Sequence, residues 1–424
     1  MNFRINFFLK QFQYYCFILF PIFLITGPFL PDLSVVFISI TFVFFSIKEK
    51  KYYFYNNIFV KFFIFWCLYL IFSSLLSENI LFSLESSLFY FRFGLFSLGV
   101  WYIIEENNHA LKLFFISLFS VFLFLIFDGY IQYFTDINIL GYAYSDFRYG
   151  DGKRLTSVFG EKSSLGKFLV FMLPLFFALV LKLYPKNNLI IFFSMSFLIL
   201  IDVLIFLSGE RTALFLLLLA TLLIIILCTK LRIIRLLTFI ISILVISIIG
   251  FKNDIVYERM VVHTIDQLNL NNSDDTGIKA FSSHHESMYI TAINMFIDKP
   301  IFGVGTKMYR VLCDDERYNY NDISCSTHPH NLYIQLLAET GIVGIIPVII
   351  LYFSISFYLF RHLLSIISGK GKLITDYQIC LLIALIVTLW PFSPSNNFFN
   401  NWHSAMLFLP VGFFLKDYLR EKNK

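Results

Sequence analysis

The chain is too apolar and too weakly charged to be a soluble globular protein. Of its 424 residues, 58% are hydrophobic and only 14% are charged, with a mean hydropathy of +0.75. Soluble domains carry about 45–50% apolar and about 25% charged residues. A soluble domain with one anchor is therefore excluded, and most of the chain must cross a membrane. The net charge of +5 is modest, and no nucleic-acid partner is expected.

Apolar stretches of roughly the length needed to span a bilayer recur along the chain. They lie at 12–30, 33–47, 57–76, 84–104, 111–132, 164–183, 188–207, 212–229, 233–250, 332–361, 374–392 and 404–416. These stretches predict an all-α polytopic membrane protein with about twelve transmembrane helices surrounded by membrane lipids. A large periplasmic loop is expected between the ninth and the tenth helix.

The charges in the turns between these stretches predict the orientation. Lys and Arg collect on the cytoplasmic side of membrane proteins. If the N-terminus is inside, the cytoplasmic turns and the tail hold Lys48, Lys50, Lys51, Lys112, Lys182, Lys186, Lys230, Arg232, Arg235, Arg361, Lys370, Lys372, Lys416, Arg420, Lys422 and Lys424. The alternate turns, such as 27–34 and 77–87, hold almost none. Both termini are therefore predicted to be cytoplasmic.

Two polar segments are left on the outer side, at 133–163 and 251–331. We expect polar chemistry there and at the adjoining helix ends. The chain divides into helices one to nine (1–250), the large periplasmic loop (251–331), and helices ten to twelve with the tail (332–424).

The cysteines fall into two groups. Four lie in or beside apolar stretches, where Cys behaves as a small apolar residue. Cys313 and Cys325 both lie in the 251–331 segment. Since that segment is expected to face an oxidising compartment, a disulfide between them is predicted, with two separate thiols as the alternative.

His328 and His330 stand directly before the tenth apolar stretch. Pro329 favours an extended approach at His328, and His330-Asn331 then opens a helix. A neutral imidazole can accept a proton from a hydroxyl group, and the positive end of the helix dipole favours the neutral form. A general base is one interpretation, and a pair of interfacial or capping residues is the other.

A zinc site is the next possibility. His284 and His285, together with His328 and His330, could supply four imidazoles, but no Cys or Asp stands at ligand spacing beside them. The sequence also contains no Asp-x-Asp pair and no phosphate-binding glycine loop. No metal or other cofactor is therefore predicted.

Further into the tenth stretch, Glu339 is an acidic residue at membrane depth, where a buried structural contact is expected and a proton relay is the alternative. Gly341 and Gly344 are expected to allow close helix approach. Before the histidines, helical spacing of apolar residues over 289–296 predicts an amphipathic surface helix. It ends at DKP (298–300), and a tight turn follows at 303–305.

Cations on the outer side predict an anion site. Arg211 in SGERTALF (208–215) begins an apolar stretch from outside, where a positive charge opposes the helix dipole. Guanidinium groups bind phosphate with two hydrogen bonds. A nearby anion is therefore expected: Glu210, a lipid phosphate or a substrate diphosphate. Arg154 in the 133–163 loop and Arg259 in the large loop are also cations on the outer side, where Lys and Arg are otherwise rare.

Three of these features together resemble a known family. They are the outer arginine in SGERTALF, the segment INMFIDKPIFGVG (293–305), and HPHNLYIQLLAETGIVG (328–344). The combination resembles the O-antigen ligase and O-antigen polymerase superfamily over roughly 155–350. Its most specific element is the His-Asn-x5-Leu-x-Glu-x-Gly pattern that begins at His330.

The resemblance implies a membrane glycosyltransferase of the GT-C type, working without a metal on a glycan carried by undecaprenyl diphosphate. His330 matches the essential histidine, and Arg211 matches the arginine that holds the diphosphate. Relatives commonly carry a second Arg four residues before an aromatic residue. With Tyr289 as that aromatic, this chain has His285 instead, so Arg259 or Arg154 is expected to supply the charge, with His328 and Asn331 in support.

Three functions remain open at this point. A ligase would pass the glycan to the lipid A core, and we favour it because of the compact length and the single large loop. A polymerase would pass it to a second lipid-linked glycan. A transporter of lipid-linked glycan would expect internal repeats and more charges at mid-membrane, whereas here the cations collect at one face.

Overall fold

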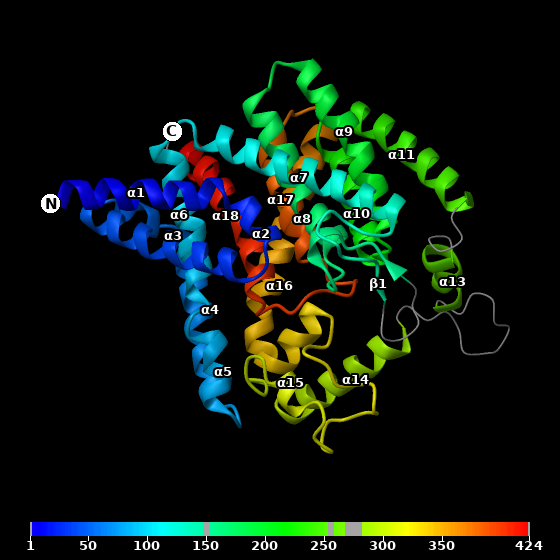
Figure 1. Cartoon of the computed structure of the whole chain (residues 1–424). Helices are drawn as coiled ribbons and strands as arrows, with labels where there is room; N and C mark the ends of the chain where they lie inside the picture. Colours follow the sequence, from blue (N-terminus) through cyan, green and yellow to red (C-terminus); the bar gives the residue numbers. More distant parts are fainter. Residues whose placement is uncertain (1, 147–152, 253–257, 268–281, 423–424) are drawn as a thin grey trace.

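A computed structural model describes residues 2–146, 153–252, 258–267 and 282–422 (Figure 1). Arg148 and parts of both outer segments lie outside these residues. The elements are α1 (Asn2–Ile18), α2 (Phe20–Ile25), α3 (Phe29–Lys48), η1 (Tyr52–Tyr55), α4 (Ile58–Leu75), α5 (Ile80–Ser87), α6 (Phe91–Glu106), α7 (Ala110–Thr135), β1 (Ser145–Asp146), β2 (Lys153–Arg154), η2 (Ser157–Phe159), α8 (Leu165–Leu183), α9 (Asn188–Leu207), α10 (Arg211–Leu227), α11 (Arg232–Lys252), η3 (Glu258–Val262), α13 (His263–Gln267), α14 (Ser283–Asp298), α15 (Tyr309–Leu312), α16 (Leu332–Ile367), α17 (Asp376–Thr388) and α18 (Asn401–Lys422).

The protein is helical and multi-pass, apart from the antiparallel two-residue strands β1 and β2. Within the described residues, eight helical segments are long and apolar enough to cross a membrane, and two apolar helices, α10 and α17, are shorter. The first and last predicted stretches are not among them. The first is divided between α1 and α2, with Pro21 just inside α2, and α18 contains Pro410. The count of twelve spans therefore stays a prediction.

Helix α8 forms the centre of the bundle. In its most apolar window 89% of the residues are buried, against 17% in α11, which lies at the edge. Helix α17 packs along α8, while α6 packs against α3 and α18. Leu, Phe and Val line α8 on all sides, as expected for a helix enclosed by other helices.

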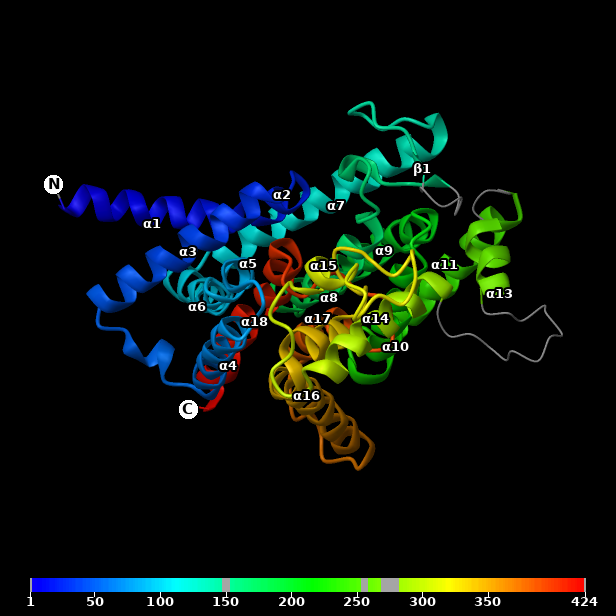
Figure 2. The same cartoon turned by 90° about the horizontal axis from the view of Figure 1, so that it is seen from below.

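Helices α14 and α15 form a separate outer unit at one end of the bundle. They lie at the lower side of Figure 1, and in front of α8 and α17 in the view from below in Figure 2. The predicted surface helix over 289–296 is part of α14. The unit has an apolar core of its own, made of Met288, Ala292, Met295, Val304, Met308, Tyr309, Leu312, Cys313, Tyr318 and Ala338. Ala338 comes from α16, so this core continues past the predicted loop boundary at 331.

Helix α16 is kinked at Gly341, whose φ of 64° and ψ of −172° are not helical. Helix α4 donates side-chain hydrogen bonds to the carbonyls around the kink. Tyr69 Oη donates to the Thr340 carbonyl at 2.5 Å, and Trp66 Nε1 donates to the Gly344 carbonyl at 2.9 Å. These bonds matter because an unsatisfied backbone group at membrane depth costs several kcal/mol. Gly341 therefore breaks the helix, where the sequence analysis expected only close helix approach.

One predicted cytoplasmic charge lies elsewhere. Arg235 is fully buried and forms a bidentate pair with Asp202 of α9, at 2.7 and 3.0 Å. Thr221 of α10 and Ser242 of α11 complete the network. The prediction that Arg235 marks a cytoplasmic turn was wrong, because the guanidinium reaches a carboxylate between helices. This pair joins α9, α10 and α11.

A second buried carboxylate holds the outer loop in place. Asp128 of α7 accepts hydrogen bonds from Asn138 Nδ2 at 3.2 Å and from the Ile139 amide at 2.9 Å, and also from the Ser157 hydroxyl. One turn later, Gln132 accepts from the Thr156 and Ser157 amides. These contacts fix the chain directly after β2, which carries Arg154.

Removing one partner of the buried pair is expected to destabilise the bundle. Asp202→Ala leaves the Arg235 charge buried, which costs about 3–5 kcal/mol. Unfolding of the purified protein in detergent measures the loss. Asp32→Ala is the matched control, because the Asp32–Arg92 pair is partly exposed and such pairs contribute about 0–1 kcal/mol. Equal losses in the two variants would contradict the structural role of the Asp202–Arg235 pair.

Candidate functional site

The outer end of α16 presents His330 in a sharp corner of the chain. His330 has a φ of 55°, a left-handed conformation that non-glycine residues rarely adopt. Asn331 caps the helix: its Oδ1 accepts from the Tyr333 and Ile334 amides at 3.0 and 3.1 Å, and its Nδ2 donates to the Pro391 carbonyl at 2.9 Å. Asn331 therefore begins the helix and ties it to the turn before α18.

Ser395 in that turn holds both histidines. Its amide donates to the His330 carbonyl at 2.7 Å, and its Oγ accepts from the Leu332 amide at 2.7 Å. His328 Nε2 lies 3.3 Å from the Ser395 carbonyl, and His328 Nδ1 lies 3.0 Å from Thr327 Oγ1. Because a carbonyl only accepts, these contacts assign the proton to Nε2 and leave Nδ1 as the acceptor.

Three imidazoles form a cluster at this corner. The rings of His328 and His330 have centroids 4.1 Å apart, and the His285 ring lies 5.8 Å from that of His330. His285 comes from the first turn of α14, where Ser282 Oγ contacts its Nδ1 at 2.6 Å. The position at which relatives commonly carry a second arginine thus lies beside His330.

Burial is the main reason that these rings are neutral. It lowers the pKa of His330 to about 2, with further lowering from His328, His285 and Lys167. It lowers the pKa of His328 to about 4, with Lys167 and Arg310 adding to the effect. The sequence analysis attributed the neutral form to the helix dipole, whereas desolvation is the larger cause here. The ring of His330 is therefore in the neutral form at neutral pH, which is the form that a general base needs before the reaction.

Two arginines from different segments meet at the turn before α10. Gly209 has a φ of 68°, and a Cβ added there would lie 2.9 Å from the Arg259 side chain and 3.9 Å from that of Arg154. Arg259 is 3% exposed, and its Nε donates to the Gly209 carbonyl at 2.9 Å. Arg211 follows two residues later as the first residue of α10. The structure thus brings the side chains of Arg154 and Arg259 to the turn that Arg211 follows.

Glu210, one of the three anions expected near Arg211, contacts the N-terminus of α8. Its carboxylate accepts from the Gly166 amide at 2.7 Å and the Lys167 amide at 3.4 Å, at the N-terminus of α8. Burial raises the pKa of Glu210, with Lys167 and these amides acting in the opposite direction. The carboxylate thus satisfies amides that α8 itself leaves unbonded.

Lys167 connects the arginines with the histidines. Its Nζ donates to Asn396 Oδ1 at 3.1 Å, and its charge reaches Glu210 on one side and both His328 and His330 on the other. Sequence analysis missed Lys167, Ser395 and Asn396. One signal was available: 391–401 reads PFSPSNNFFNN, a Pro-, Ser- and Asn-rich turn on the outer side between two apolar stretches.

The glycine segment 300–305 lies against the kink of α16. Val304 and Gly305 amides donate to the Ala338 and Glu339 carbonyls at 3.0 and 2.9 Å, and the Ile342 amide donates back to Pro300 at 2.9 Å. Gly303 and Gly305 both have positive φ, and a Cβ on Gly303 would meet the α16 backbone at 2.4 Å. The predicted turn is therefore also a backbone contact that only glycine allows.

Glu339 is fully buried in this contact. Its Oε1 accepts from the Tyr309 amide at 3.1 Å and its Oε2 from Gln335 Nε2 at 3.0 Å. Gln335 also contacts Asn397 and the Phe398 amide. The carboxylate joins α16, α15 and the turn before α18, which fits the expected structural contact.

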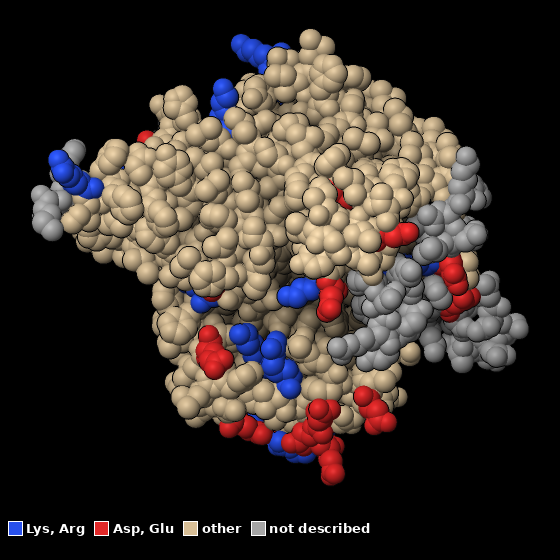
Figure 3. Space-filling view, viewed as in Figure 1, with Lys and Arg blue, Asp and Glu red and all other residues tan. Residues whose placement is uncertain are grey.

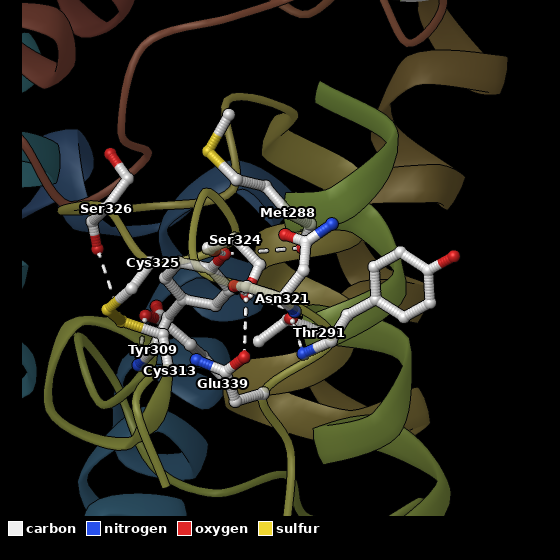
Figure 4. Close-up of a disulfide and its surroundings, with 11 residues drawn as sticks. Met288, Thr291, Tyr309, Cys313, Asn321, Ser324, Cys325, Ser326 and Glu339 are labelled. Carbon is white, nitrogen blue, oxygen red and sulfur yellow. Dashed lines mark hydrogen bonds between the residues drawn. A yellow bond between two sulfur atoms is a disulfide. The ribbon is translucent and has the colours of Figure 1, made fainter. Parts of the chain in front are cut away.

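Cys313 and Cys325 form a disulfide with Cα atoms 5.0 Å apart. Figure 4 shows it beside Tyr309 and Glu339. Tyr309 Oη donates to the Ser324 carbonyl at 2.6 Å, which fixes the irregular segment leading to His328. Asp314 and the two cysteines are the only described group close enough to hold a metal, but both sulfurs are occupied by the disulfide.

Lysine and arginine side chains gather in a hollow between the bundle and the outer unit, as Figure 3 shows. On the outer unit, Lys307 is half-buried, and burial, followed by nearby Arg310, lowers its pKa. Several cations held close together favour an anionic ligand.

A comparison with protein families agrees with this geometry. The O-antigen ligase family model matches residues 195–349. This match supports the resemblance to the O-antigen ligase/polymerase superfamily over that part of the chain. A search of curated proteins found no match. The O-antigen ligase domain contains Arg211, Arg259, His285 and His330, whereas Arg154, Lys167 and the turn before α18 lie outside it.

Thiol labelling tests the disulfide by counting the free cysteines. In the denatured, unreduced protein, maleimide is expected to label the four free cysteines, and after reduction all six. The Cys313→Ser/Cys325→Ser double variant is the control and is expected to give four labels before and after reduction. Six labels on the unreduced wild type would contradict the disulfide.

Proposed function

We propose that the protein is an O-antigen ligase, an inverting glycosyltransferase that works without a metal. Its donor is a glycan on undecaprenyl diphosphate, and its acceptor is a sugar of the lipid A core. The observation that carries the proposal is the neutral, buried His330 within reach of the Lys167 charge, with Arg154 and Arg259 together at the turn before α10. The single large outer segment at 251–331 favours a ligase over a polymerase.

His330 acts as the general base. An acceptor hydroxyl gives its proton to the imidazole as its oxygen attacks the anomeric carbon of the donor sugar. The bond from that carbon to the phosphate oxygen breaks, and the configuration of the carbon inverts. The Ser395 contacts and the Asn331 cap hold the corner rigid, so that the ring meets the hydroxyl in one orientation.

The leaving group is undecaprenyl diphosphate, which departs with the bonding electrons. Arg211, Arg259 and Arg154 are assigned to its phosphates, because guanidinium groups match phosphate oxygens. Cations fixed before the reaction stabilise the charge that develops on the phosphate. His285 and His328 support the ring of His330 from either side.

The twelve-span topology is part of the proposal, with both termini cytoplasmic and His330 facing the periplasm across the inner membrane. Lys and Arg in the cytoplasmic turns support it, even without the buried Arg235. The disulfide supports it further, because such bonds persist in oxidising compartments. The outer unit then corresponds to the predicted loop 251–331, extended by the first turns of α16.

Replacing the base is expected to abolish transfer. His330→Ala removes the proton acceptor, so transfer should fall by at least about 100-fold while the unfolding midpoint stays near that of the wild type. Purified protein is supplied with undecaprenyl-diphosphate glycan and lipid A core, and products are separated on gels. His109→Ala, on an exposed residue before α7, is the control and should remain active. Activity of His330→Ala near that of the wild type would contradict the mechanism.

The products also distinguish the two reactions of the superfamily. A single addition to the core supports the ligase. A ladder on the lipid carrier, formed without core, identifies a polymerase and overturns the choice of acceptor.

The pH dependence tests the buried state of the base. With the pKa of His330 lowered to about 2, kcat/KM should not fall through protonation of this ring between about pH 7.5 and about pH 5. The same shift lowers stability as pH falls below 6.5, since only the unfolded chain then binds the proton. The unfolding midpoint is therefore measured at each pH. A loss of kcat/KM centred near 6.5 in folded protein would contradict the burial.

A further inference from the structure

His403 lies in the first turn of α18 and is a buried residue whose ring has no hydrogen-bond partner among the described residues. It is 0% exposed. Neither Nδ1 nor Nε2 has a hydrogen-bond partner within the described part of the chain. Buried polar side chains are almost always hydrogen-bonded, and a neutral imidazole offers one donor and one acceptor. The ring therefore has room in its hydrogen bonding for a partner from outside the described chain, either a water or a bound molecule.

The surroundings of His403 point to the kind of molecule. Its ring contacts Phe171 of α8, with centroids 5.8 Å apart. Lys167 lies four residues before Phe171, on the same face of α8 and one turn nearer the outer end. Lys167 and His328 are the groups whose charges reach the His403 ring. The His403 imidazole therefore lies near Lys167, on the cationic side of the site.

The chain that leads into α18 supports this position. Asn396 accepts from Lys167, and Ser395 holds His328 and His330. The same turn then runs directly into α18 and His403. One short segment thus connects the proposed base, the lysine and the His403 imidazole, although it lies outside the matched family domain.

We propose that His403 is a ligand-binding residue of this site: one ring nitrogen donates to a phosphate oxygen of the lipid-linked diphosphate, beside Lys167. The other nitrogen accepts a hydroxyl hydrogen from the first sugar. This inference rests on the proposed function, because that function supplies the diphosphate. It assigns His403 to binding and leaves proton transfer to His330.

The test compares two lipid probes on the full-length protein in detergent. Undecaprenyl diphosphate carries the phosphates, and undecaprenol carries the same tail without them. His403→Phe keeps the contact with Phe171 but loses the hydrogen bond. Since a hydrogen bond to a charged group contributes about 1.5–3 kcal/mol, the Kd for the diphosphate is expected to rise about tenfold or more, with the Kd for undecaprenol unchanged.

Two further variants separate binding from structure. His403→Gln keeps a donor and an acceptor, so it should bind the diphosphate more tightly than His403→Phe does. His362→Gln is the matched control. His362 is also 0% exposed, and its Nε2 also lacks a partner among the described residues. It lies near the far end of α16, whereas His330 stands just before the start of that helix. It should leave both Kd values unchanged.

The outcomes are distinct. Unchanged diphosphate binding in His403→Phe overturns the inference. An equal loss for both probes, or a loss in His403→Gln as large as in His403→Phe, also overturns it, because the ring is then structural. If the wild type binds the diphosphate no better than undecaprenol, the proposed function itself fails.

Discussion

The fold depends on how a broken membrane helix satisfies its backbone. Helix α16 stops being regular at Gly341, and the freed carbonyls at membrane depth need donors. Tyr69 and Trp66 supply two from the α4 side, and the amides of Val304 and Gly305 supply others from the outer unit. The break therefore fastens the outer unit to the bundle, and the proposed base stands at the end of the short helical piece that results.

Buried charge is used in two ways in this protein. Asp202 and Arg235 neutralise each other between three helices, and Glu339 is surrounded by amide donors. Each of these carboxylates accepts several hydrogen bonds, as a buried charge needs. Around Gly209 the arrangement differs, because Arg154 and Arg259 lie together while Glu210 turns towards α8. Cations held close together are suited to an anionic ligand, whereas the Asp202–Arg235 pair is suited to stability.

Local patterns predicted most of the helices and the family resemblance, because apolar length, turn charges and the His-Asn-x5-Leu-x-Glu-x-Gly motif are all local signals. The meeting of Arg154 and Arg259 depends on tertiary packing, which no local spacing encodes. Lys167 looked like the ordinary start of a span, and Arg235 looked like a cytoplasmic marker. Their true partners, Asn396 and Asp202, lie 229 and 33 residues away, and only the packed bundle reveals them.

The contact between 300–305 and Gly341 also sets where the chain can be cut and rejoined. Residues 332–340 contribute to the outer core through Ala338 and to the glycine segment through their carbonyls. The membrane half of α16 begins only after the kink. A chimera that exchanges the outer unit between relatives must therefore carry the chain through Gly341 as one block. A junction at the apparent start of α16 would separate the glycines from the backbone they were selected to fit.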